Sequence, residues 1–152
     1  MAGRKRAAAE VNMGVLEELL GYHVRRAQLS FFAGFSEACA DLGLSPGLFA
    51  VLEVVYRNPG LTQTAVSKAL YTDRSAMVAA IDKLESMNLI ERRPSANDRR
   101  SYALYATEYC LSWYPSAEDK VKDHEELVLA NLDMQERDQL LALLQKLNAA
   151  KA

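Results

Sequence analysis

The sequence contains few of the residues that mark disulfide-rich, metal-binding or membrane proteins. Two cysteines and two histidines among 152 residues are too few for a disulfide framework or for a zinc site built from cysteine pairs. Seven glycines and four prolines exclude a collagen-like or low-complexity chain. No apolar run approaches the ~18 residues that a membrane-spanning helix needs, and no secretory signal follows the basic start. We therefore expect one cytoplasmic domain or subunit with no metal, no cofactor and no membrane association.

The motifs of common enzyme sites are missing as well. There is no glycine-rich phosphate loop, no Gly-x-Ser-x-Gly nucleophile elbow and no histidine pair at metal-ligand spacing, so we expect that the protein is not an enzyme. The net charge is −2, yet residues 62–102 carry seven basic against five acidic side chains. Because charges are screened beyond about 8 Å at physiological salt, such a locally basic segment can bind phosphate within an acidic chain.

The spacing of apolar residues predicts helices over most of the chain. Steps of three and four residues predict one long helix over residues 11–40. Ser45 with a proline after it is typical of a helix start, and we expect a buried helix over 48–56. Toward the C-terminus, Asp133 and Glu136 have the spacing of a capping box, which a final amphipathic helix follows.

Two shorter helices and a hairpin are expected between these long segments. Thr62 is predicted to cap the first short helix, and Thr72 or Asp73 the second. The second has an apolar stripe at Met77, Ala80, Ile81, Leu84 and Met87.

Asn88 is expected to end the second short helix in the left-handed conformation. Residues 89–93 and 101–107 then alternate with a period of two, which predicts two strands joined by a polar, basic turn. In the helix expected after the second strand, Pro115 requires either a kink or a late start.

A short helix, a tight link, a second helix and a basic hairpin follow one another as in a winged helix-turn-helix. On the second helix Ser75, Val78 and Ala79 are small enough to approach base edges in a major groove. Lys68 and Arg74 are suited to neutralise phosphates, and arginines at the hairpin tip suit a narrow minor groove. The alternative is a helical interaction module without DNA binding, although such a module does not need four arginines on one hairpin.

From about Leu16 to Leu147 the sequence also resembles the MarR family of bacterial transcription regulators. The segments that carry the resemblance are Leu61-Thr62-Gln63, Asp73-Arg74-Ser75, Leu84-Glu85, Leu89-Ile90-Glu91-Arg92 and, most specifically, Asp98-Arg99-Arg100-Ser101, with Leu104 and Thr107 after it. In that family the wing aspartate braces the tip and the arginine two positions on enters the minor groove, which corresponds to Asp98 and Arg100. The chain departs from the family at Cys110, where glycine is usual, and at Val78 and Ala79, where polar or basic residues are frequent.

The resemblance implies a mainly α fold with a small β-hairpin wing, a winged helix-turn-helix within an intertwined helical homodimer. Residues 45–113 would form the DNA-binding lobe, and residues 1–44 with 114–152 the helical dimerisation region. Such a two-fold dimer binds a pseudo-palindromic operator in double-stranded DNA. The residues predicted to contact DNA are Thr62, Gln63, Lys68, Arg74, Ser75, Val78, Ala79, Asp98, Arg99 and Arg100.

Members of this family are commonly switched by a small ligand, and the first helix contains a candidate site. Two adjacent arginines in a largely apolar helix, followed by phenylalanines, suit a small aromatic acid or an aryl-CoA thioester. The string from Tyr22 to Gln28 also looks like that of members that respond to hydroxycinnamoyl-CoA compounds. The residues predicted to bind the effector are Tyr22, His23, Arg25, Arg26, Phe31, Phe35, Tyr56 and Trp113.

We therefore predict a repressor of aromatic-compound catabolism genes that its ligand relieves. Other interpretations stay open. The arginine pair would contact acidic groups of the partner subunit or DNA phosphates, and the phenylalanines would pack in the dimer core. As a different switch, the regulator would sense thiol oxidation at Cys39 or Cys110.

Overall fold

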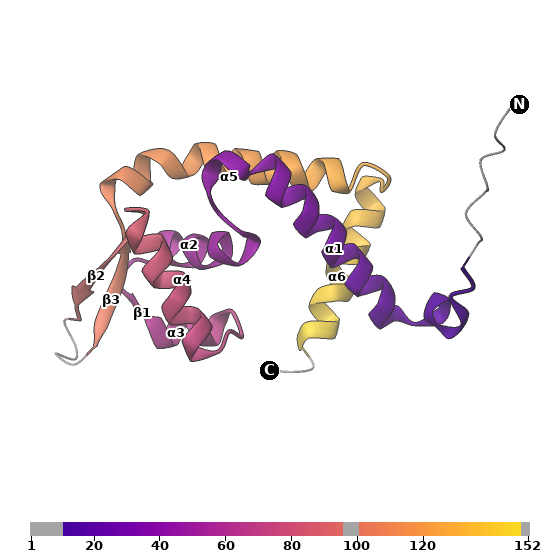
Figure 1. The fold of residues 1–152 in the computed structure, drawn as a ribbon, viewed down its shortest axis with the longest axis horizontal. Coiled ribbons are helices and arrows are strands. Elements are labelled where there is room, and N and C mark those ends of the chain that lie inside the picture. The colour runs from indigo at the N-terminus through magenta and orange to yellow at the C-terminus, as the bar shows by residue number, and fades with distance from the viewer. Residues whose placement is uncertain (1–10, 96–100, 150–152) are drawn as a thin grey trace, which may run out of the picture.

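The computed structural model describes residues 11–95 and 101–149, which form a mainly helical chain with one small sheet (Figure 1). The elements in chain order are the 3₁₀ helix η1 (Gly14–Glu18), α1 (Leu20–Ala38), the 3₁₀ helix η2 (Ala40–Leu42), α2 (Pro46–Arg57), β1 (Leu61–Thr62), α3 (Gln63–Ala69), α4 (Arg74–Ser86), β2 (Ile90–Pro94), β3 (Tyr102–Ala106), α5 (Glu108–Val128) and α6 (Met134–Ala149).

Side-chain caps begin the helices of the winged lobe where the sequence predicts them. The Ser45 hydroxyl accepts from the Leu48 N–H at 3.3 Å, and the Thr62 hydroxyl accepts from the Ala65 N–H at 3.3 Å. Asp73, rather than Thr72, caps α4. Each cap satisfies a backbone donor that the first helical turn leaves unpaired. The predicted left-handed terminator is also confirmed, because Asn88 has a φ of +57°.

The hairpin is part of a three-stranded antiparallel sheet with the order β1-β3-β2. Ile90 of β2 lies opposite Ala106 of β3, so the predicted strand pair is confirmed. The third strand, β1, was not expected, because Thr62 was interpreted only as a helix cap. Gly60 allows this pairing with a φ of +94°, and its N–H donates to the Leu104 carbonyl at 2.8 Å.

The core of the lobe lies between α2, α4 and the sheet. Met77, Ile81 and Leu84 of α4 are fully buried, and the partly buried Ala80 and Met87 pack against the same cluster, as the predicted stripe requires. The members of this cluster that come from the other lobe elements are Val51, Leu52, Val55, Val66, Leu89, Ile90 and Leu104. One apolar face of α4 is therefore fixed inward, and the opposite face is left to solvent.

The prediction of one helix over residues 11–40 is wrong. A 3₁₀ turn, η1, is followed by Leu19 in an extended conformation, so that α1 begins only at Leu20. Gly14 has a φ of +54°, which also keeps the preceding residues out of a regular helix. The apolar spacing continues through this break because leucines stand on both sides of it, and no proline marks the site.

The helix after the sheet starts early despite its proline. The Thr107 hydroxyl accepts from the Cys110 N–H at 3.0 Å, and α5 then runs through Pro115 without a late start. The Thr107 hydroxyl also donates to the Asn88 carbonyl at 2.6 Å, which ties this start to the end of α4. Because α5 spans residues 108–128, one continuous helix crosses residue 113 and leaves the lobe.

The turn between α5 and α6 is held by a confirmed capping box and by one arginine. The Asp133 N–H donates to Glu136, and the Glu136 N–H donates back to Asp133, both at 2.9 Å. Arg137 donates to the Leu129 and Leu132 carbonyls at 3.0 and 3.1 Å. These contacts satisfy carbonyls at the end of α5 and direct α6 back alongside α1 (Figure 1).

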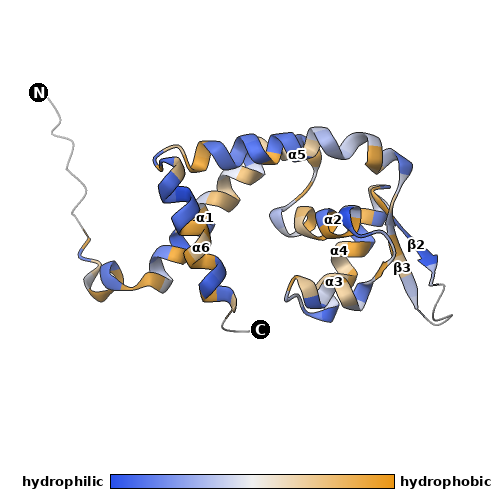
Figure 2. Ribbon diagram, turned by 180° about the vertical axis from the view of Figure 1, so that it is seen from behind, coloured by the Kyte–Doolittle hydropathy of each residue, from blue (hydrophilic) through white to orange (hydrophobic). Residues whose placement is uncertain are grey.

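Hydrophobic residues occur both in the winged lobe and in α6 at the other end of the molecule (Figure 2), but the two ends differ in how well they bury them. None of the side chains of α6 is buried, although the helix carries leucines at 140, 141, 143, 144 and 147 that are 37% to 63% exposed. In the described parts of the chain, no helix is long and apolar enough to cross a membrane.

Candidate DNA-binding surface and ligand cavity

The outward face of α4 carries the small residues that the sequence predicts for base contact. Ser75, Val78 and Ala79 are exposed, while Met77 and Ile81 on the opposite face are fully buried. The structure therefore brings together the three predicted readout residues on one accessible helix surface. Lys68, at the end of α3, is exposed as well.

A polar cleft of about 370 Å³ lies between the starts of α3 and α4 and the sheet. Thr62, Gln63 and Arg74, all predicted DNA contacts, line it. The residues that sequence analysis did not assign to this cleft are Thr64, Ser67, Arg92, Ser101, Tyr102 and Leu104. A cleft with the Arg74 guanidinium and several hydroxyls is suited to hold a phosphate backbone.

Arg92 fixes the wing to α4. Its guanidinium pairs with Asp82 and Glu85 of α4, and its backbone N–H donates to Glu85 at 3.3 Å. The side chain is only 23% exposed, so these contacts are partly screened from water. Arg92 thereby offsets two carboxylates beside the cleft that would otherwise repel phosphate. Sequence analysis named Arg92 within the wing segment that resembles the MarR family, but it did not predict the ion pairs with Asp82 and Glu85.

One further residue belongs to this surface, and three predicted contacts cannot be placed on it. Tyr71, in the link between α3 and α4, has a φ of +50° and is 78% exposed, and sequence analysis did not single it out. Asp98, Arg99 and Arg100, the predicted contacts at the wing tip, lie outside the described residues.

A second, aromatic cavity of about 400 Å³ lies between α1, α2 and α5. It is lined by Gln28, Phe31, Phe32, Phe35, Pro46, Phe49, Val121, His124 and Glu125. We call this the aromatic cavity. Phe31 and Phe35 were predicted ligand contacts, whereas Phe49 and His124 were missed, because only the packing of α2 and α5 against α1 brings them there.

His124 is one of three polar residues at the wall of the aromatic cavity, with Gln28 and Glu125. Its Nε2 is 3.0 Å from the Phe31 carbonyl oxygen, and its ring meets those of Phe31 and Phe35 edge-on. Gly34 makes this approach possible, because a Cβ there would lie 2.6 Å from the His124 ring. His124 is buried, as its place on a helical stripe led us to expect, but it also faces a cavity.

An aliphatic cavity of about 500 Å³ adjoins the aromatic one between α1, α5 and α6. The two share Gln28, Phe31 and Glu125. His23, another predicted ligand residue, lines the aliphatic cavity together with leucines of α6.

The structure places the other predicted ligand residues outside both cavities. Tyr22 and Arg26 contact each other, with the guanidinium carbon 5.9 Å from the ring centroid. Neither Arg25 nor Arg26 forms an ion pair with any residue in 11–95 or 101–149, and both are exposed. Tyr56 and Trp113 do not line either cavity and instead pack against the core. The expected association of these residues with Phe31 and Phe35 is therefore not seen in one chain.

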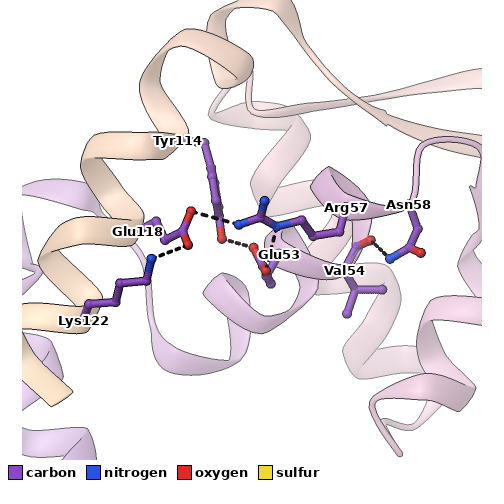
Figure 3. A network of polar contacts seen from close by, with 7 residues as sticks. All are labelled: Glu53, Val54, Arg57, Asn58, Tyr114, Glu118 and Lys122. Atoms are coloured by element: carbon purple, nitrogen blue, oxygen red, sulfur yellow. Dashed lines mark hydrogen bonds and ion pairs between the residues drawn. The ribbon is translucent and has the colours of Figure 1, made fainter.

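Tyr56 belongs to a contact between α2 and α5, whose polar members Glu53, Arg57, Tyr114 and Glu118 are drawn in Figure 3. Its ring stacks on that of Tyr114 with 4.1 Å between centroids, and the Tyr114 hydroxyl donates to the Glu53 carboxylate. Arg57 bridges Glu53 at 3.0 Å and Glu118 at 2.9 Å. We call these five residues the α2–α5 junction.

The junction is in contact with the aromatic cavity. The Phe49 ring, which lines the cavity, is nearly parallel to the Tyr114 ring at 6.0 Å. Burial raises the pKa of the Tyr114 hydroxyl, and its hydrogen bond to Glu53 raises it further. Lys122 lowers the pKa of Glu118 through a hydrogen bond at 2.7 Å, so this carboxylate is charged at neutral pH.

Comparison with known proteins identifies the family. The profile of the MarR family matches residues 42–101, which include α2 to β2. A relative from Thauera aromatica, named as a transcriptional regulatory protein for the hcr operon, is 36% identical over 140 residues, which is 91% of this chain and 84% of the relative. The chain belongs to the MarR family. It is thus a winged helix-turn-helix transcriptional regulator.

Two solved structures of one MarR-family repressor, CouR, are similar over nearly their full length. CouR bound to a 23-mer DNA duplex is 37% identical with a TM-score of 0.87, and the match covers 92% of this chain and 99% of CouR. CouR bound to p-coumaroyl-CoA is 34% identical with a TM-score of 0.83, and the match covers 91% and 98% of the two chains.

The two thiols of this MarR-family chain are poorly placed for redox sensing. Cys39 and Cys110 are both fully buried. Burial raises the pKa of Cys110 to about 11, and burial together with the charge of Asp41 raises the pKa of Cys39. Since the thiolate is the reactive form, these surroundings disfavour the thiol-sensing alternative.

We expect Tyr114 to stay protonated when exposed tyrosines ionise. A group whose pKa is raised by folding stabilises the folded state fully below its unfolded pKa of about 10 and loses that contribution as the pH rises further. An alkaline titration followed by tyrosinate absorbance should therefore leave Tyr114 protonated until the chain unfolds. Tyr114→Phe should remove this last step, whereas Tyr109→Phe, at an exposed position of α5, should leave it in place. Ionisation of all seven tyrosines near pH 10 in the folded protein would contradict the buried hydrogen bond.

Proposed function

We propose that this MarR-family regulator is a dimeric repressor that binds a pseudo-palindromic operator and releases it when an aromatic effector fills the aromatic cavity. The observation that carries the proposal is the pairing of two sites in one chain. The exposed small-residue face of α4 lies beside the polar cleft, and the aromatic cavity lies at the α2–α5 junction.

DNA binding is supported by the chemistry of the lobe and by similarity. Arg74 lines the polar cleft next to the exposed face of α4, so phosphate contact and base contact would come from adjacent turns. CouR, at 37% identity, has been solved on a DNA duplex. We assign phosphate contacts to Thr62, Gln63, Lys68 and Arg74, and keep Asp98, Arg99 and Arg100 as proposed wing contacts by family match. A helical adaptor without DNA binding leaves this cleft unexplained.

The effector class is supported by the lining of the aromatic cavity. Phe31, Phe35 and Phe49 surround a space of about 400 Å³, within the range of small-molecule sites, and His124 supplies a polar group at its wall. The similar repressor CouR has been solved with p-coumaroyl-CoA. We propose an aromatic acid or its CoA thioester as effector and aromatic-compound catabolism as the controlled process. Arg25 and Arg26, on the same helix, have no carboxylate partner within the described residues and are the candidates to meet anionic groups of such a ligand.

The dimer is supported by apolar surface that one chain leaves uncovered. The leucines of α6 are only partly covered within the described residues, and Val15, Leu19 and Leu20 near the start of α1 are exposed as well. Soluble monomers rarely expose a contiguous apolar surface of this kind, because burial contributes roughly 25 cal/mol per Å². We propose that α1, α6 and the distal part of α5 pair with a second copy, with residues 45–113 as the lobe and 1–44 with 114–152 as the dimerisation region.

Removal of one phosphate contact tests DNA binding. Arg74→Ala should weaken binding to DNA from the region upstream of the protein's own gene and lower the slope of log affinity against log salt by about one. Fluorescence anisotropy at several salt concentrations gives this slope. Lys146→Ala removes the same charge from the exposed end of α6 and should leave both quantities unchanged. An unaltered slope for Arg74→Ala would exclude the cleft as the phosphate site.

Release of that DNA tests the effector class. p-Coumaroyl-CoA should release it at low micromolar concentration, whereas acetyl-CoA, which lacks the ring, should not. A ligand acts only through its different affinity for the free and DNA-bound states. Phe31→Ala should raise the concentration needed by about tenfold, equal to 1.4 kcal/mol, while Leu29→Ala at an exposed position of α1 should not. Release by free p-coumarate alone would exclude the thioester, and release by neither would exclude the aromatic class.

A charge on the leucine face of α6 tests the dimer. Leu143→Glu should shift the mass in light scattering from twice 16.9 kDa toward 16.9 kDa, because a buried, unpaired carboxylate opposes association. Gln145→Glu adds the same charge to another side of α6 and should remain dimeric. A Leu143→Glu protein of unchanged mass would place the subunit contact elsewhere.

A further inference from the structure

The outward face of α4 has a chemistry that restricts which bases it can read. At 3.6 residues per turn, Ser75, Val78 and Ala79 lie on one side of the helix, opposite the buried Met77 and Ile81. Arg74 is directed toward the polar cleft, where it lies with Arg92 and Tyr102. Ser75, Val78 and Ala79 are none of the arginine, lysine, asparagine or glutamine residues that make bidentate contacts with guanine or adenine. The same side of α4 continues with Asp82, which pairs with Arg92, and with the exposed Lys83 in the last turn.

The hydroxyl of Ser75 is already committed as a donor. Its Oγ lies 2.6 Å from Oδ1 of Asp73, and that carboxylate has no proton to give. The same oxygen accepts the N–H groups of Ser75 and Ala76, both at 2.9 Å, which fixes the position of the serine at the helix start. Ser75 thus presents only lone pairs outward, and it acts as a hydrogen-bond acceptor toward any group above α4.

An acceptor at this point distinguishes the bases of a major groove. Adenine N6 and cytosine N4 are the donors there, whereas guanine O6 and N7 and thymine O4 are acceptors. An oxygen with no free proton attracts the amino donors of adenine and cytosine and repels the acceptor atoms of guanine and thymine. Ser75 therefore favours an amino group at the base pair it meets.

The next two outward positions are methyl surfaces. Val78 is 37% exposed although it is branched and apolar, and Ala79 beside it is exposed as well. The thymine C5 methyl is the apolar group that a major groove offers to such side chains. Because thymine pairs with adenine, A·T pairs satisfy both the methyl surface and the acceptor.

We propose that α4 reads its operator through an adenine or cytosine amino group that donates to Ser75 and through thymine methyl groups that pack against Val78 and Ala79. This readout rests on the DNA binding proposed above. In this readout the three residues determine which base pairs α4 prefers, and contacts of the polar cleft with phosphates supply affinity for DNA of any sequence.

The test removes single methyl groups from DNA. The full-length protein first selects duplexes from a library with a random core, and each thymine of a selected duplex is then replaced singly by uracil. Replacement at the contacted thymines should weaken binding by about fourfold per methyl, the value expected for one buried methyl group. Val78→Ala should reduce that penalty. Ser86→Ala, an exposed position in the last turn of α4, should keep the full wild-type penalty.

A second variant tests the acceptor. Ser75→Ala should lose the preference for adenine or cytosine at one base pair and keep the uracil penalties, with helix content by circular dichroism unchanged. The readout is overturned if uracil is neutral at every thymine, or if Ser75→Ala and wild type select the same base at every position. If no duplex is enriched over the library, DNA binding itself fails, and this outcome differs from enrichment without methyl dependence.

Discussion

The contact between Tyr114 and α2 determines how the winged lobe sits on the helix that leaves it. Tyr114 is fully buried, stacks on Tyr56 and Phe49, and donates its hydroxyl to Glu53. Arg57 pairs with Glu53 within α2 and adds an ion pair from α2 to Glu118 of α5. Rigid aromatic rings and a buried hydrogen bond allow few alternative arrangements, because a shift of either helix would leave a polar group unpaired. The orientation of α4 relative to the far end of α5 depends on this junction.

The same junction gives a physical route between the two proposed sites. Phe49 both lines the aromatic cavity and stacks on Tyr114, so a ligand that moves Phe49 acts on the junction directly. From there α2 leads through Gly60 into β1 and the cap of α3, the elements beside the polar cleft. Coupling of this kind requires that the junction can pack in two discrete ways. It does not require a long series of residues that transmit the change from one site to the other. The proposed subunit contact on α6 lies at the opposite end, where a second copy would hold the two lobes at a fixed separation.

Local signals predicted most of the lobe. Ser45, Thr62 and Asp73 cap the helices that follow them, and Asn88 ends α4 in the left-handed conformation, because each effect involves atoms only a few residues apart. The prediction failed where the local pattern did not reveal a break or a strand. The apolar spacing over residues 11–40 fits one helix, yet Leu19 is extended and divides it. β1 was missed because a two-residue strand has no periodicity of its own.

The candidate sites divide in the same way. The sequence by itself determined the outward residues of α4 and the family, since helix phase and short motifs are local properties. Only the tertiary structure decided the aromatic cavity, because Phe35, Phe49 and His124 come from three helices whose packing no local spacing encodes. It also separated Tyr56 and Trp113 from the phenylalanines and gave Arg92 its carboxylate partners. Side chains far apart in the sequence meet only after the core has fixed the helices, and the chemistry of a pocket depends on those meetings.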